Sequence, residues 1–297
     1  MNKTLKTVGV VIGSAAAIKA GAKDVNAVDV SAAYGISTNN LTSEHGTKLE
    51  FDGMKMHGVD LRIGIPVDAG FLRGIEAGFS YNMSLGKGKL TENHLTKDMG
   101  DDLKLTIRND ISAKAMRYDL ALVGPRTGVF DHVLVLSGDR FDITKSDIYD
   151  AHVEIIGVTN FDLSGSNNPK GTYKVNGFDA GYALRTGHSI GGVNLSGQML
   201  IALGRSSAKG DWKEQLGGIK SFDEKSTYLR LGFGAEAEMD LGTVSPFFGA
   251  SLGFWQSLSG SYKQTDDSSS TAKTSFDKAQ KYNRLNAGIY AGGRVKF

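Results

Sequence analysis

Residues 284–297, RLNAGIYAGGRVKF, carry the pattern that decides the fold of this chain. One set of alternate positions is apolar or small and includes Leu285, Ile289 and Phe297. The other set is charged, small or polar and includes Arg284 and Arg294. Because successive side chains of a β-strand point to opposite faces, this alternation predicts a strand with one apolar and one polar face.

The same alternation recurs along most of the 297-residue chain. Each alternating segment is about ten to fifteen residues long, which suits a strand that is tilted across a bilayer with every second side chain facing lipid. No run approaches the roughly 18 apolar residues that a membrane helix needs. The sequence therefore predicts an all-β protein, a closed antiparallel transmembrane β-barrel. A water-soluble β-sandwich with similar alternation is the alternative fold.

Short turns and long polar loops follow one another in strict alternation. Short turns are predicted near 66–70, 124–128, 186–192 and 241–243, with Pro66 ending a strand, and long loops near 86–110, 137–171, 205–225 and 259–281. This asymmetry is typical of outer-membrane barrels, which have short periplasmic turns and long extracellular loops. Within 137–171, residues 153–158 fit a continued strand, a small hairpin above the membrane or an extra pair of spanning strands. The barrel is therefore expected to have ten strands, with twelve as the alternative.

The chain ends on its closing strand with an aromatic residue, Phe297. In this it resembles the bacterial outer-membrane β-barrel proteins, whose final strand typically closes the barrel and ends in Phe. Gly293 departs from that pattern, because a large apolar residue is usual there. The resemblance implies a Gram-negative outer-membrane location, contact with outer-membrane lipid, and Phe297 as an assembly signal. It also implies periplasmic chaperones and the barrel-assembly machinery as partners.

The amino terminus has the features of an export signal. Lys3 and Lys6 precede a short apolar stretch at 7–18, and Ala20-Gly21-Ala22 supplies the small residues of a cleavage site. We therefore expect a signal peptide at 1–22 and the barrel at 23–297, with an amphipathic first helix of a soluble domain as the alternative. Removal of residues 1–22 leaves 31 basic and 32 acidic residues. A nearly neutral chain argues against nucleic-acid binding, which needs a concentrated positive field.

The polar faces of the predicted strands gather acids and arginines in nearly equal number. A ten-stranded barrel is only a little wider than an eight-stranded one, whose interior is filled by side chains. We interpret the set as Arg–carboxylate pairs that plug the lumen and hold the strands in register. The alternative is a narrow porin-like channel for ions or small solutes. The expected lumen-lining charged residues are Asp60, Arg62, Glu76, Arg117, Asp119, Asp179, Arg185, Arg230, Glu236, Glu238, Asp240, Arg284 and Arg294, and Phe247 and Trp255 share their face.

No catalytic, metal or cofactor site is predicted. The chain has no cysteine, and its six histidines lack metal-ligand spacing. The predicted function is a structural, surface-exposed barrel without enzymatic activity, whose loops either bind an extracellular ligand or only protect the barrel. The alternative is an omptin-like hydrolase, since omptin proteases are ten-stranded barrels that use carboxylates and an Asp–His pair at the extracellular rim. Asp150-Ala151-His152 superficially resembles that pair, and Asp101-Asp102 lies in another loop on the same side.

Overall fold

In the computed structural model of the protein, the residues whose placement is defined are 28–44, 47–95, 103–155, 158–162, 171–212, 221–265, 271–276 and 282–297. The regular elements in these ranges are all strands, and none of the described residues forms a helix that could cross a membrane. The expected signal peptide at 1–22 lies outside the described residues and stays a prediction. The strands are β1 (Asp29–Glu44), β2 (Thr47–Ala69), β3 (Leu72–Ser84), β4 (Gly88–Leu95), β5 (Leu103–Thr127), β6 (Phe130–Ile155), β7 (Val158–Asp162), β8 (Gly171–Ile190), β9 (Val193–Trp212), β10 (Ser221–Met239), β11 (Val244–Thr265), β12 (Thr271–Phe276) and β13 (Tyr282–Lys296).

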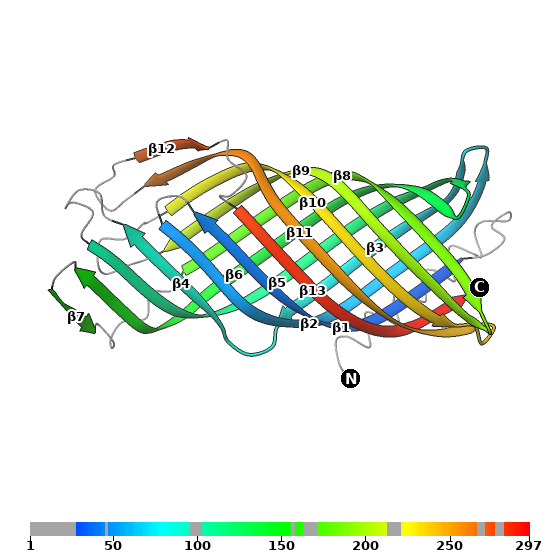
Figure 1. Cartoon of the computed structure of the whole chain (residues 1–297), viewed down its shortest axis with the longest axis horizontal. Helices are drawn as coiled ribbons and strands as arrows, with labels where there is room; N and C mark the ends of the chain where they lie inside the picture. Colours follow the sequence, from blue (N-terminus) through cyan, green and yellow to red (C-terminus); the bar gives the residue numbers. More distant parts are fainter. Residues whose placement is uncertain are drawn as a thin grey trace.

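Ten of these strands close into a single antiparallel barrel (Figure 1). The wall runs β1, β2, β3, β5, β6, β8, β9, β10, β11 and β13, and β13 pairs with β1 to complete it. After β3 ends, β4 takes its place between β2 and β5. A closed wall has no edge strand with unpaired backbone groups. The predicted ten-stranded barrel is confirmed.

All four short turns lie at one end of the barrel, which we call the turn end, and the carboxy terminus lies there too (Figure 1). Each turn contains glycine with a positive φ angle: Gly70, Gly128, the pair Gly191 and Gly192, and Gly242. These backbone conformations are open to glycine without a steric penalty. The prediction that Pro66 ends a strand is wrong, because β2 continues past it to residue 69. The register between β2 and β3 shifts directly after Pro66.

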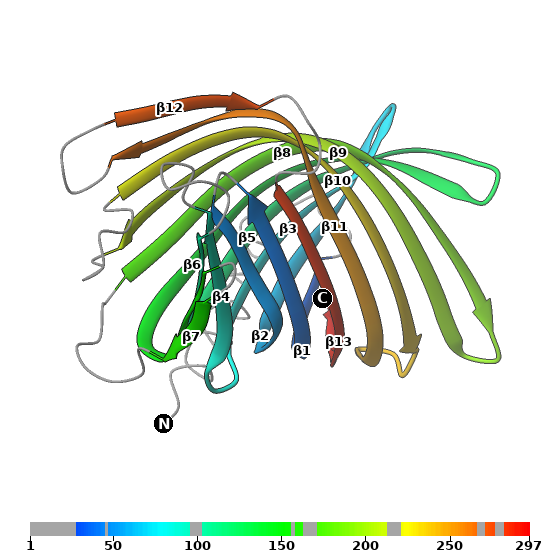
Figure 2. The same cartoon turned by 60° about the vertical axis from the view of Figure 1, so that its left-hand side comes forward.

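The opposite end, which we call the loop end, carries strands that are much longer than expected (Figure 2). Much of the four stretches that were expected to be loops is strand: β4, the early part of β5, most of β6, the end of β9, the start of β10, the end of β11, and β12. Residues 130–155 form one unbroken strand, β6, and β7 folds back against it as a small hairpin. Residues 137–171 therefore add no spanning pair among the described residues. The polar stretches were misread because polar composition was taken to mean loop.

The apolar side chains change sides along the barrel. Near the turn end they point outward, and on β6 the outward Leu134 and Leu136 are 58% and 41% exposed. Farther along the same strand Phe141 and Ile143 point inward and are each 1% exposed, while their neighbour Arg140 lies outside. The strand thus keeps its period of two, but its apolar face passes from the outside of the barrel to the inside.

A small apolar cluster also occupies part of the interior of the turn-end half. It explains why both faces of residues 130–136 are apolar in sequence: one face points outward, and Val133 and Val135 pack inside. The cluster consists of Ala121, Val133, Val135, Ala183, Leu200 and Ala202, with Val123 against it.

The first and last strands meet in a seam that extends to the final residue. The Phe297 backbone N–H donates to the Val28 carbonyl oxygen at 3.0 Å, and the Val28 N–H donates to the Phe297 carbonyl oxygen at 3.3 Å. The Phe297 side chain packs on a cluster of Val28 and Val30. The chain therefore completes its wall with its terminal residue.

Candidate functional site

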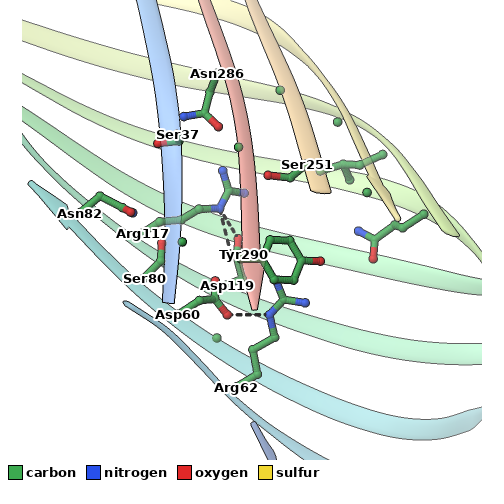
Figure 3. Close-up of a pocket in the computed structure, with 18 of the residues that line it drawn as sticks. Ser37, Asp60, Arg62, Ser80, Asn82, Arg117, Asp119, Ser251, Asn286 and Tyr290 are labelled. Carbon is green, nitrogen blue, oxygen red and sulfur yellow. Dashed lines mark hydrogen bonds and ion pairs between the residues drawn. The ribbon is translucent and has the colours of Figure 1, made fainter. Parts of the chain in front are cut away.

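A polar cavity of about 560 Å³ lies inside the barrel and reaches from residues near the turn end, such as Asp29 and Arg294, toward Trp255 and Arg284. Ten of the thirteen charged residues expected to face the lumen line it, and four of the ten, Asp60, Arg62, Arg117 and Asp119, are labelled in Figure 3. The ten are Asp60, Arg62, Glu76, Arg117, Asp119, Arg185, Arg230, Glu236, Arg284 and Arg294.

The remaining three expected residues have different positions. Asp179 and Glu238 are buried, and each is paired with an arginine that does line the cavity, Arg230 and Arg294 respectively. Asp240 does not face the lumen: it is exposed in the last short turn, where its Oδ1 accepts the Gly242 N–H at 3.1 Å. The alternation ends at this turn, which is why extending the pattern to residue 240 failed.

Near the turn end, Arg294 of β13 links two acids of β10. Its Nη2 lies 2.8 Å from Glu236 Oε1, and its Nη1 bonds to Glu238 Oε2. Lys296 Nζ adds a contact of 3.3 Å to Glu238. The Tyr290 hydroxyl donates to Glu236 at 3.4 Å. These bonds join the closing strand to a strand two positions away in the wall.

Other pairs extend along β2, β3 and β8. Arg62 Nε lies 2.9 Å from Asp60 Oδ1 within β2, and both side chains face the space occupied by Tyr290 (Figure 3). Arg185 of β8 makes two bonds to Glu76 of β3. The ion pairs in the lumen thus combine contacts within one strand with contacts between distant strands.

A denser network fills the middle of the lumen. Arg117 Nε lies 2.8 Å from Asp119 Oδ1, and its Nη2 donates to Ser137 Oγ at 2.8 Å. Arg230 Nη1 lies 3.1 Å from Asp179 Oδ1, and the Tyr228 hydroxyl donates to the same carboxylate at 3.0 Å. Because Asp179 is fully buried, these donors replace the water that its carboxylate would otherwise need.

Two aromatic rings lie above this network, toward the loop end. The guanidinium carbon of Arg284 is 4.6 Å from the centre of the Phe141 ring and 4.8 Å from the centre of the Trp255 ring. The guanidinium carbon of Arg230 lies 5.3 Å from the same Trp255 ring centre. Arg284 also pairs with Asp139 at 3.4 Å. Arginine stacked between rings makes a compact layer across the lumen.

Beyond that layer the interior is mostly apolar, with the buried carboxylate-bearing residue Glu224 of β10 in register between Ala208 and Tyr262. Eleven buried residues form one cluster, which we call the interior plug, and they come from seven strands of the wall. Since their strands surround the lumen, their contacts cross it. Burial raises the pKa of the Tyr262 phenol, as expected where water is excluded. The plug consists of Leu41, Met54, Met56, Ile111, Ala113, Phe141, Ile143, Tyr173, Val175, Ala208 and Tyr262.

The sequence interpretation missed this plug and several members of the network. Ser137 and Asp139 continue the inward set of β6, but they fell in the stretch 137–171 that was predicted to be a long loop. A signal was present: Ile111 and Ala113 alternate with charged and polar neighbours, but on the face opposite to that of the membrane segment. Testing for a switch of the apolar face would have found them.

The residues of the hydrolase alternative are only partly described. The β6 backbone places Asp150 opposite Arg108 and His152 opposite Thr106, both on β5 near the loop end. Asp101-Asp102 falls outside the described residues. Among the residues that the structure describes, no group of histidines and acids could hold a metal ion.

No family model and no curated protein matches the chain. Solved structures do. The outer membrane protease OmpT from Escherichia coli is similar over 92% of this chain and 98% of its own, with 11% identity and a TM-score of 0.67. The translocator domain of the autotransporter NalP from Neisseria meningitidis is similar over 97% of this chain and 96% of its own, with 12% identity and a TM-score of 0.38. A major outer membrane protein from Thermus thermophilus is similar over 89% of this chain and 99% of its own, with 13% identity and a TM-score of 0.37. The first of these similarities, together with the closed ten-stranded wall, shows that the chain has the fold of a bacterial outer-membrane β-barrel.

Proposed function

We propose that the chain is an integral protein of the bacterial outer membrane whose barrel serves a structural, surface-exposed role and does not conduct solutes. Support for the membrane comes from the outer wall. A complete row of cross-strand neighbours on five successive strands is apolar there: Leu120, Leu136, Ala180, Leu203 and Leu229. A water-soluble protein rarely exposes so continuous an apolar surface.

The interior plug is the observation that carries the non-conducting role. An ion that leaves the polar cavity toward the loop end meets the Arg284 layer and then a cluster of side chains such as Leu41, Met54 and Ile143, each at most 2% exposed. Moving a charge into such a dry region costs many kcal/mol. The cavity is therefore a vestibule that is closed toward the loop end.

Planar bilayer recording tests this proposal. The refolded wild-type protein is expected to insert, as shown by heat-modifiable migration on gels, and to give no conductance steps. The triple variant Leu41→Ser, Met54→Ser, Ile143→Ser removes apolar bulk from the plug and is expected to give measurable steps if it inserts. A steady conductance from the inserted wild type would contradict the closed lumen.

A second candidate function is hydrolysis at the loop end, favoured by the fold similarity to OmpT and by the position of Asp150 and His152 near the end of β6. The double variant Asp150→Ala, His152→Ala tests it on peptide substrates. Cleavage by the wild type that is lost in the double variant would establish the hydrolase, whereas equal turnover by both proteins would remove it. Asp142→Ala, an outward substitution lower on β6, is the control and should cleave as the wild type does.

A further inference from the structure

The outer wall carries a row of charged residues between the apolar surface and the loop end. Six of them are direct cross-strand neighbours on six successive strands, β5 to β11 in the wall order. The row spans about 24 Å, because neighbouring strands lie about 4.8 Å apart. Its members are Lys114, Asp142, Lys174, Lys209, Asp223 and Lys263.

Three further outward cations lie in the next two rows of outward-facing neighbours toward the turn end. Arg140 on β6 and Lys225 on β10 belong to the row that also contains Asn176 and Ser207, and Arg205 on β9 lies one row lower, opposite Phe178. The next row down is the apolar row from Leu120 to Leu229. We call these nine charged residues of three rows the basic wall; it has seven cations and two acids.

The basic wall lies at the height of lipid headgroups if the apolar row lies in hydrocarbon. Asp142 follows Leu136 by six residues on β6, a separation of about 20 Å along the strand at 3.3 Å per residue. At a strand tilt of about 40° this is about 15 Å along the barrel axis. Lysine and arginine side chains are long enough to reach down from that height to phosphates at the hydrocarbon boundary.

The cations of the basic wall are poorly compensated by their own protein. Lys174 and Lys209 are both exposed and directly opposite each other, an arrangement that is destabilising between neighbouring strands. Lys209 lies 4.0 Å from Asp223, and Asp142 is already bound by Arg140 at 2.9 Å. Lys114, Lys174, Lys225 and Lys263 form no ion pair with another described residue. An external anion would remove this repulsion.

The opposite wall differs. The described outward side chains of β1 and β13 are uncharged, with Asn40 and Thr42 on β1 and Asn283 on β13 nearest the loop end. The nearest outward cation beyond them is Lys55 on β2, opposite Thr38. The positive charge is therefore concentrated on one side of the barrel.

We propose that the basic wall binds the phosphate groups of anionic lipids in the leaflet next to the loop end. The inference rests on the proposed membrane location. Several lysines spaced about 5 to 10 Å apart suit a layer of phosphates better than one soluble anion. Clusters of basic residues beside a membrane attract anionic lipid in this way. The opposite wall, which lacks such a cluster, stays in contact with any lipid.

Electron paramagnetic resonance of spin-labelled lipids tests the proposal on the full barrel in phosphatidylcholine vesicles. The wild type is expected to bind spin-labelled phosphatidylglycerol about fivefold better than spin-labelled phosphatidylcholine at low salt, with the preference lost in about 1 M salt. The variant Lys174→Glu, Lys209→Glu is expected to lose the preference. Lys55→Glu, on the opposite wall, is the matched control and should keep it.

The outcomes separate the two proposals. A protein that fails to insert, judged by heat-modifiable migration, overturns the membrane location and this inference with it. Insertion without a phosphatidylglycerol preference, or equal preference in the double variant and the wild type, overturns the lipid site alone. Displacement of phosphatidylglycerol by an equal concentration of free glycerol phosphate would also overturn it, because the site would then be one for soluble phosphate.

Discussion

Arg185 and Glu76 form a bidentate ion pair across the barrel interior, with Nη1–Oε1 and Nη2–Oε2 distances of 2.5 and 2.9 Å. Two strands, β5 and β6, separate their parent strands β8 and β3 in the wall. A pair of this geometry holds the curvature of the wall as well as its register, because both hydrogen bonds require the two strands to face each other at a set distance.

Substitution of Glu76 by Gln should therefore destabilise the barrel. The side chains of Arg185 and Glu76 are 27% and 33% exposed, so we expect a loss of about 1–2 kcal/mol rather than the 3–5 kcal/mol of a fully buried pair. Urea unfolding of the lipid-inserted protein, followed by tryptophan fluorescence, measures this. The exchanged pair Glu76→Arg, Arg185→Glu should recover part of the loss, and no recovery would speak against a specific pair.

Gly204→Ala should also destabilise the barrel, for a steric reason. A Cβ atom on Gly204 would lie 2.5 Å from Cζ of the Tyr228 ring, which packs over the glycine and is held by its bond to Asp179. Overpacking of this kind costs about 1–3 kcal/mol. Gly234→Ala on the next strand is the control, since the nearest atom would be 3.9 Å away. Equal unfolding midpoints for the two variants would refute the packing argument.

The switch of the apolar face predicts a reversed tolerance for charge. Ile143→Asp places a carboxylate in the interior plug and should cost more than about 3 kcal/mol or prevent folding. Thr144→Asp, one residue farther along β6 on the exposed outer face, should change stability by less than about 0.5 kcal/mol. Refolding yields and unfolding midpoints measure both. In a barrel with a polar lumen throughout, the order would be the opposite.

Variants of Phe297 distinguish two roles of the terminal residue: recognition of its side chain during assembly, and closure of the wall by its backbone hydrogen bonds. Phe297→Ala keeps both backbone hydrogen bonds to Val28 but removes the ring. If the assembly machinery recognises the aromatic side chain, this variant should accumulate unfolded in cells but refold in detergent as the wild type does. Heat-modifiable migration on gels measures the folded fraction in both cases. Deletion of residue 297 removes the backbone bonds as well and should impair both. Normal assembly of Phe297→Ala in cells would exclude the signal.

The sequence was sufficient to predict the membrane half of this barrel. Alternation such as that of Leu285 and Ile289 against Arg284 depends only on the strand geometry and on what lies on each side of the wall. The turns near Gly70, Gly128 and Gly242 were found because a positive φ angle strongly favours glycine. The partners within the lumen could not be predicted, since pairing of Arg185 with Glu76 rather than a nearer acid depends on how the closed wall places distant strands.

The loop-end half was misjudged for a physical reason. Polar residues such as those between Asp139 and Asp150 were taken as loop because they cannot face hydrocarbon. Outside the hydrocarbon layer, however, a strand needs no apolar outer face, and the same alternation can bury Phe141 and Ile143 inside while Arg140 is exposed on the outer face. The period of two was intact in the sequence, and only the direction in which the apolar face pointed had changed.

That change of face also sets how deeply the barrel lies in the bilayer. The strands that contribute to the plug mark the level at which hydrocarbon gives way to water, and on β6 this level lies between Leu136 and Phe141. Moving the switch by two residues on all of these strands would raise or lower the protein in the bilayer by about 5 Å at the usual rise and tilt. Immersion is thus encoded residue by residue, and a bilayer of mismatched thickness must deform around the barrel rather than shift it.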